Sequence, residues 1–212
     1  MREITYTLLS DGTSDKALMP VIDWIIRQHF PDLLVQRQWA DLSRLPLPPS
    51  PGLLTERIRQ AITLYPCDWL FIHRDAEKAP ASDRREEIEK AWRDTGTLAD
   101  HKRVISIVPV RMTEAWLLFD ELAIRKAASN PAGRQSITLP PAHTLEALPD
   151  PKQYLKHLLR EASGLTGRRL QKFNESRGIQ LVADYTPDYS PLRKLSAFIE
   201  FEESVKRLIE PA

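Results

Sequence analysis

Acidic residues follow three apolar segments of the sequence, at the positions where those segments end. Asp11 and Asp15 come after the first segment, Asp75 and Glu77 after a later one, and Glu114 after the next. Carboxylates gathered at one place repel one another unless a cation lies among them. Oxygen ligands without a His or Cys set suit Mg²⁺ or Mn²⁺ better than zinc. We therefore predict a metal site that supports phosphoryl transfer or phosphodiester hydrolysis.

Each of these acids also has an ordinary structural interpretation. Asp11-Gly12 is a common turn dipeptide, and Asp15 and Glu114 suit the first turn of a helix. Asp75 is different because it directly follows the wholly apolar segment WLFIH. The metal-site hypothesis rests on the joint placement of the acids at three strand ends. If residues 75–77 stay extended, both carboxylates of that pair point the same way.

The segment SDGTSD, from Ser10 to Asp15, fits two other phosphate-handling motifs poorly. A dehalogenase-type phosphatase needs a nucleophilic Asp two residues before the Asp of Asp-Gly-Thr, where this chain has Leu9. A P-loop needs a glycine-rich turn that ends in Gly-Lys-Ser/Thr, and this segment has one glycine and a different order. The histidines are scattered and none is assigned to catalysis: His29, His73, His101, His143 and His157.

Basic residues lie next to the acids in the sequence and are also frequent in residues 151–194. The net charge is only +1, but residues 151–194 hold nine Lys and Arg against four Asp and Glu. Contacts with phosphate supply most of the sequence-independent affinity for nucleic acids. We predict that Arg74, Arg111 and Lys152 contact substrate phosphates. The alternative is that these residues, like the other bases of the stretch, lie on solvated helix faces: Lys156, Arg160, Arg168, Arg169 and Lys172.

Four strands are expected to position the acids. They are the β-branched and aromatic segments Glu3 to Leu9, Leu33 to Trp39, Trp69 to His73 and Val104 to Val110. Helical patterns separate them, beginning at Ser14, Leu53, Ser82 and Thr113. Thr13 or Ser14 is expected to cap the first helix and Thr113 the last, and no helix is expected to cross the proline-rich segment 46–52. This alternation predicts an α/β fold with a mostly parallel sheet, whose ligands bind at the carboxyl ends of the strands.

The rest of the chain, residues 129–212, has a different composition. Residues 129–151 carry five prolines and are expected to form a long loop. Helices are expected at about 152–163, 166–175 and 191–209, packed on the sheet as a cap. We therefore expect a single domain in two parts, an α/β core over 1–128 and a loop with a C-terminal helical extension over 129–212.

Cysteine usage and hydropathy exclude several classes of protein. The one cysteine, Cys67, rules out an internal disulfide and a four-thiolate zinc site. No apolar stretch approaches the roughly 18 residues of a membrane span, and the N-terminus lacks the apolar run of a signal peptide. We expect a cytoplasmic protein.

Two short motifs resemble those of the Toprim domain, the metal-binding catalytic fold of topoisomerases, primases and OLD-type nucleases. Asp11-Gly12-Thr13-Ser14-Asp15 resembles its first acidic turn, and Asp75-Ala76-Glu77 resembles its Asp-x-Asp pair. More narrowly, the chain resembles a bacterial Toprim-like family of unknown function, often encoded beside an ATPase in defence or mobile-element neighbourhoods. That likeness also includes the segment MTEAWLL (112–118), Asp150-Pro151-Lys152 and the tail from Phe198 to Leu208.

The resemblance implies a Rossmann-like Toprim core and a metal-dependent nuclease or related phosphodiester-cleaving effector. Asp11, Asp75 and Glu77 would be catalytic and would bind Mg²⁺ or Mn²⁺, with Asp15 and Glu114 completing the metal shell. Nucleic acid, DNA or RNA, would be the substrate, and an ABC- or AAA-type ATPase a partner in defence. The alternative is a catalytically inactive Toprim-like subunit that binds or regulates the ATPase. The family usually has Glu where this chain has Asp11, and Asp where it has Glu77.

Overall fold

Four segments rich in β-branched and aromatic residues form one sheet. The computed structural model describes residues 2–43, 45, 53–77, 79–96 and 103–208. The strands in these ranges are β1 (Arg2–Leu9), β2 (Leu33–Trp39), β3 (Trp69–His73) and β4 (Arg103–Ile107). Neighbouring strands are all parallel, in the order β2-β1-β3-β4. The expected α/β fold with a mostly parallel sheet is therefore confirmed, and its core is Rossmann-like.

Helices connect the strands and continue after the last one. The α-helices are α1 (Leu18–His29), α2 (Leu53–Leu64), α3 (Ala81–Arg93), α4 (Glu121–Ala127), α5 (Pro151–Ser163), α6 (Gly167–Gln171), α7 (Glu175–Tyr185) and α8 (Ser196–Lys206). Short 3₁₀ helices are η1 (Thr13–Ala17), η3 (Thr113–Leu117), η4 (Ala142–Ala147) and η5 (Ser190–Lys194). None of the described helices is long and apolar enough to cross a membrane.

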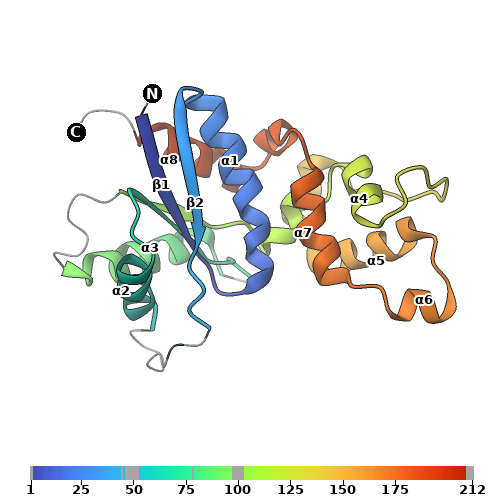
Figure 1. The fold of residues 1–212 in the computed structure, drawn as a ribbon, viewed down its shortest axis with the longest axis horizontal. Coiled ribbons are helices and arrows are strands. Elements are labelled where there is room, and N and C mark those ends of the chain that lie inside the picture. Colours follow the sequence, from blue (N-terminus) through green and yellow to red (C-terminus); the bar gives the residue numbers. More distant parts are fainter. Residues whose placement is uncertain (1, 44, 46–52, 78, 97–102, 209–212) are drawn as a thin grey trace.

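The central strands are apolar on both faces, so helices cover the sheet on two sides (Figure 1). Because side chains alternate across a strand, Tyr6 and Phe71 pack into the layer that contains α1 and α8. Leu70 and Ile72 pack into the opposite layer, with α2 and α3. All five residues of β3 are buried, as predicted for a central strand.

The strand order creates a switch point between β1 and β3. The chain leaves β1 through α1 to reach β2 on one side, and then returns through α2 to β3 on the other side. Loops that follow the two strands therefore diverge at the carboxyl edge of the sheet. In open α/β sheets this crevice is where ligands bind.

Helices α4, α5 and α7 lie beside the sheet, whereas α8 returns to cover one of its faces (Figure 1). Helix α7 contacts α4, α5 and η1, which ties this group to the edge of the core. Gly178 allows the close packing of α7 on α5, since a Cβ there would lie 3.0 Å from Cδ1 of Leu159. The basic extension is thus held next to the loops that leave β1 and β4.

The first helix begins later than predicted. Residues from Thr13 to Ala17 form the 3₁₀ helix η1, and α1 starts only at Leu18. An α-helix from Ser14 would place Pro20 in its interior, where the missing N–H and the ring clash are costly. In α1 that proline falls in the first turn instead. Neither Thr13 nor Ser14 caps a helix with its side chain, so that prediction is wrong.

The segment after β3 and β4 also differs from expectation. Strand β4 ends at Ile107 rather than Val110, and Pro109 in the following segment has no N–H to donate. Thr113 starts a 3₁₀ helix, η3, without capping it, because its hydroxyl faces His73 and Asp75. The backbone nevertheless continues beside β3, since the N–H groups of Ala76 and Glu77 donate to carbonyls of the 109–111 segment.

The C-terminal helices were only partly predicted. Helix α5 agrees with expectation, but α6 is five residues long and α7 occupies a stretch for which no helix was expected beyond residue 175. Helix α4 was likewise not expected, and the proline-rich loop contains η4. The segment 46–52 lies outside the described residues.

Candidate functional site

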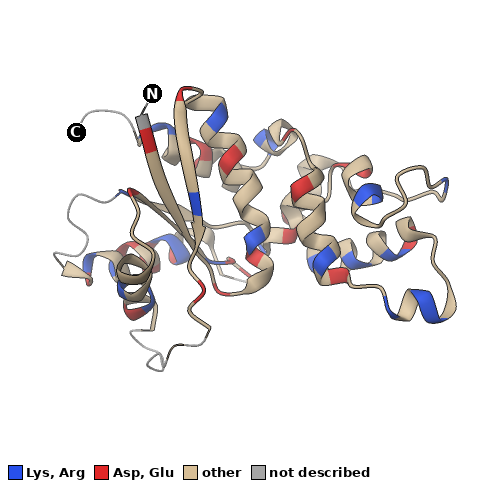
Figure 2. Cartoon of the chain, in the orientation of Figure 1, with Lys and Arg blue, Asp and Glu red and all other residues tan. Residues whose placement is uncertain are grey.

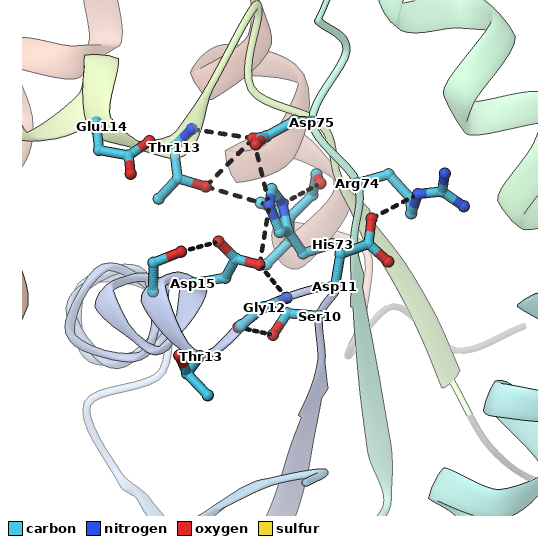
Figure 3. Close-up of polar contacts among 12 residues, drawn as sticks. Ser10, Asp11, Gly12, Thr13, Asp15, His73, Arg74, Asp75, Thr113 and Glu114 are labelled. Carbon is cyan, nitrogen blue, oxygen red and sulfur yellow. Dashed lines mark hydrogen bonds and ion pairs between the residues drawn. The ribbon is translucent and has the colours of Figure 1, made fainter. Parts of the chain in front are cut away.

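His73 is the centre of a polar cluster at the carboxyl ends of β1 and β3 (Figure 3). It is the last residue of β3 and only 2% exposed. Its Nδ1 lies 3.1 Å from the carbonyl oxygen of Ile107 at the end of β4. Its Nε2 lies 3.4 Å from Oδ1 of Asp75 and 3.9 Å from Oδ2 of Asp15. A buried imidazole therefore joins acids that come from two different loops.

The surroundings of His73 set its protonation. A carbonyl oxygen only accepts, so Nδ1 carries a proton. Burial lowers the pKa of His73, but the hydrogen bond to Asp75, the charges of Asp75 and Asp15 and the carbonyl of Ile107 raise it, and the net pKa is raised. The two carboxylates thus favour the protonated ring, against the effect of burial.

Asp75 is fixed by the start of η3. The backbone N–H of Thr113 donates to its Oδ1 at 3.0 Å, and the Thr113 hydroxyl lies 3.5 Å from the same oxygen. That hydroxyl is also 3.2 Å from Nε2 of His73. Within the described residues, Oδ2 of Asp75 makes no hydrogen bond. The half-buried carboxylate therefore has one oxygen available for a ligand.

Asp15 is buried at the start of η1, where it also serves the turn. Its Oδ2 accepts from the backbone N–H of Gly12 at 2.8 Å, and the Ser14 hydroxyl lies 3.2 Å from its Oδ1. These bonds close the turn SDGTSD and aim the carboxylate at His73 (Figure 3). One conformation of Asp15 therefore both stabilises the turn and places its carboxylate in the cluster.

Glu114 and Lys152 complete the cluster from η3 and α5. Glu114 is 3% exposed, and Nζ of Lys152 lies 3.1 Å from its Oε1. Burial lowers the pKa of Lys152, but Glu114, Asp15 and Asp75 raise it, and the net pKa is raised. Asp150 caps α5 by accepting from the N–H of Gln153 at 2.9 Å, which places Lys152 in the first turn. The ammonium group therefore lies in the field of three carboxylates.

Asp11 faces a different set of neighbours. Its carboxylate forms ion pairs with Arg57 of α2 and with Nε of Arg74, the latter at 2.9 Å. In Figure 3 it points toward Arg74, whereas Asp15 and Asp75 point toward His73. Its side chain is 47% exposed. Two guanidinium groups therefore already balance the acid that was predicted to lead the first motif.

Glu77 and Arg111 have left-handed backbone conformations, with φ of 55° and 67°. The condition under which the two carboxylates of 75–77 would point the same way is therefore not met. The Glu77 side chain is 65% exposed and lies 3.9 Å from Nη2 of Arg84. The N–H of Glu77 donates to the carbonyl of Arg111 at 3.0 Å. The two carboxylates of the predicted pair have different partners, since Asp75 contacts His73 and Thr113 whereas Glu77 faces Arg84.

The structure thus sorts the predicted residues into two groups. Asp15 and Asp75 contact His73, and Lys152 pairs with Glu114 in the field of the same two acids. The other four lie apart from this cluster: Asp11, Arg74, Glu77 and Arg111. Among the described residues, no set of three or more His, Cys, Asp or Glu side chains is close enough to hold a metal ion on its own.

Sequence reasoning missed His73 and Thr113 as members of the cluster. His73 ends an otherwise apolar strand, one residue from the switch-point loop, and that position was a usable signal. Thr113 was assigned to a helix cap, and only its contacts with His73 and Asp75 show otherwise.

Comparisons with known proteins identify no relative: no protein-family model, curated protein or solved structure matches this chain.

Proposed function

We propose that this protein is a metal-dependent phosphodiester hydrolase, most simply a nuclease. The observation that supports the proposal is the convergence of Asp15, Asp75 and Glu114 at the carboxyl edge of the sheet, from the segments that follow three different strands. This is the crevice in which open α/β folds bind ligands. Lys152 reaches into the same place.

The charge of the cluster leaves room for a cation. Three carboxylates face Lys152 and His73, so one negative charge remains even when the imidazole is protonated. Mg²⁺ needs only one or two protein carboxylates, because water and substrate phosphate supply its other ligands. The free oxygen of Asp75 and the carboxylate of Asp15 fit that requirement, while Glu114 pairs with Lys152. A bound Mg²⁺ or Mn²⁺ would activate water and neutralise charge on the leaving oxygen.

The other residues of the cluster act by positioning and by charge. Thr113 holds Asp75 through its backbone N–H and hydroxyl. His73 fixes the separation of Asp75 and Asp15 by lying between them. Lys152 carries its ammonium group on a flexible side chain and would exchange its contact with Glu114 for one with a substrate phosphate.

A basic surface continues from the cluster along the helical extension, which favours nucleic acid as the substrate. Lys152, Lys156 and Arg160 recur every four residues on α5 and therefore share one face. Helix α6 has no buried residue, and neither Arg168 nor Arg169 makes an ion pair within the described part of the chain. Figure 2 shows the bases of α6 at the end of the molecule farthest from the sheet. Such a surface suits a phosphate backbone.

The Toprim-like resemblance supports two further parts of the proposal. It suggests a role in anti-phage or mobile-element defence together with a nearby-encoded ABC- or AAA-type ATPase. We also propose a cytoplasmic location, where DNA and RNA substrates occur.

Cleavage by an Asp75→Asn variant tests the proposed function. The amide keeps an oxygen for the Thr113 N–H, so the fold should persist while the metal ligand is lost. We expect Mn²⁺-dependent cleavage of plasmid DNA or RNA by the wild type and a loss of at least about 100-fold in the variant. Asp184→Asn, an exposed acid on α7, is the matched control and should cleave normally. Equal cleavage by wild type and Asp75→Asn would exclude this site.

The second candidate function is a catalytically inactive subunit that binds or regulates the ATPase. Two observations favour it: Asp11 is paired with Arg57 and Arg74, and Glu77 faces Arg84. Calorimetric titration with Mn²⁺ separates the two functions. No Mn²⁺ binding by the wild type, together with a stable complex with the neighbouring ATPase, would favour the second.

A further inference from the structure

A cavity of about 530 Å³ opens beside the loop that carries Asp75. Its lining residues are Glu77, Ala79, Arg84, Arg111, Met112 and Pro149. Two guanidinium groups face one carboxylate there, so the cavity has an excess of positive charge. It is also connected to the acid cluster through the backbone, since Met112 precedes the Thr113 that holds Asp75.

Arg111 is the first sign of a ligand in this cavity. Its φ of 67° belongs to the left-handed region, where a residue other than glycine is strained. The hydrogen bond from the Glu77 N–H to its carbonyl maintains that conformation. Among the described residues the Arg111 side chain makes no hydrogen bond or ion pair. An arginine thus occupies a position that favours glycine, and no hydrogen bond or ion pair within the described part of the chain accounts for its guanidinium group.

Arg84, on α3, is the second sign. Its Nη1 lies 2.9 Å from Oε2 of Glu87, but its Nη2 is 3.9 Å from Oε2 of Glu77, too far for a hydrogen bond. Its Nε is buried and has no hydrogen-bond partner in the described structure. A buried donor without an acceptor is destabilising, and an anionic oxygen would satisfy it.

We propose that Arg84 and Arg111 form a subsite for one phosphodiester phosphate, next to the phosphate that would be cleaved at the acid cluster. A guanidinium group can bind two phosphate oxygens at once, and two such groups, one from helix α3 and one from the segment after β4, would fix a strand in register. Glu77 limits the affinity of the free cavity by its negative charge. This inference rests on the proposed phosphodiester chemistry and adds the place where the strand beyond the scissile bond is held.

Binding of a thymidine dinucleotide with a single phosphodiester tests the subsite without cleavage. Isotope-labelled protein is titrated in EDTA while the arginine Nε–H signals are followed by NMR. We expect saturable shifts of the Arg84 and Arg111 signals, and affinity lowered about tenfold or more in Arg84→Gln and in Arg111→Gly. Arg111→Gly should also raise Tm, because glycine relieves the strain.

Ser129→Gly is the matched control. Ser129 has φ of 59°, so glycine relieves the same kind of strain, yet this residue does not line the cavity. Its Tm should rise while dinucleotide binding stays unchanged. Arg85→Gln, the neighbour of Arg84 that pairs with Glu200, controls for loss of charge on α3 and should bind normally.

Several results would overturn the subsite. These are unchanged dinucleotide affinity in both arginine variants, a lower Tm in Arg111→Gly, and binding of inorganic phosphate without binding of the dinucleotide. Failure of the proposed function gives a different pattern, in which wild-type protein binds the dinucleotide through both arginines but cleaves nothing with Mn²⁺. Cleavage with an unchanged KM in the Arg84→Gln/Arg111→Gly double variant would contradict the subsite alone.

Discussion

The side chains of the acid cluster, Asp15, Asp75 and Glu114, are positioned by contacts with other residues of the protein. Glu114 is buried and pairs with Lys152, and Asp75 depends on the backbone of η3. A carboxylate buried in this way is stable only while its counter-charge remains. The cluster should therefore respond to the loss of a single partner as a unit.

Replacement of Lys152 by Met tests this dependence. The variant leaves Glu114 buried without its cation, and we expect the free energy of unfolding to fall by about 1–3 kcal/mol. In the double variant Lys152→Met/Glu114→Gln the loss should be smaller than in the single variant, because the unpaired charge is gone. Urea denaturation measures both. Additive losses would mean that the two side chains do not interact.

At the scale of elements, the carboxylate of Glu202 joins helix α8 to η5 and to α1. Buried Glu202 accepts from Nη2 of Arg193 at 2.6 Å and lies 2.8 Å from Nε2 of His29 at the end of α1. Burial raises the pKa of Glu202, but the hydrogen bonds and charges of Arg193 and His29 lower it, and the net pKa is lowered. The contact thus joins α8 to η5 and α1 only while Glu202 is ionised.

Low pH should remove the contribution of Glu202 to the stability of the fold. Because the folded pKa of Glu202 is lowered, its stabilising effect is present above the unfolded value of about 4.3 and is lost as pH falls through the folded pKa. We expect Glu202→Gln to be less stable than wild type by about 2 kcal/mol at neutral pH, with the difference shrinking in acid. Thermal denaturation at several pH values measures it. Glu203→Gln, an exposed neighbour on α8, should show no such pH-dependent difference.

At the scale of the whole molecule, the charge is divided between the core and the extension. Helix α6 carries its bases on an exposed projection, far from the sheet (Figure 2). Asp15, Asp75 and Glu114 lie at the strand ends. A nucleic-acid strand that reached the cluster along α5 would also contact α6. The projection should then contribute to affinity through electrostatics rather than through packing.

Salt dependence measures that contribution. Neutralising the three exposed bases in Arg168→Gln/Arg169→Gln/Lys172→Gln should weaken oligonucleotide binding and reduce the slope of log K against log salt by about 2. A control with three exposed bases elsewhere, Arg27→Gln/Arg93→Gln/Lys194→Gln, carries the same change in charge. Fluorescence anisotropy over a range of NaCl concentrations compares them. Equal slopes in the two triple variants would place the binding surface elsewhere.

The strands and several helices could be predicted from local pattern alone. The bounds of β2 and β3 agree with the predicted segments. Both strands are runs of apolar or β-branched residues that end at turns, and such a pattern can be recognised from neighbouring residues alone. Helix α7 could not be predicted in this way, since Gly178 lowers its intrinsic helix propensity and the packing on Leu159 compensates. Pattern is thus reliable where an element is stabilised locally and fails where tertiary packing stabilises it.

The sequence by itself determined the residue types at the sheet edge, namely acids after three strands and bases near them. Only the tertiary structure decided which of them meet. Asp15 and Asp75 contact His73, and Glu114 pairs with Lys152. Asp11 instead pairs with two arginines, and Glu77, in a left-handed backbone conformation, faces Arg84. The physical reason is that strand order places residues at an edge, but side-chain direction depends on loop conformation and on partners distant in sequence.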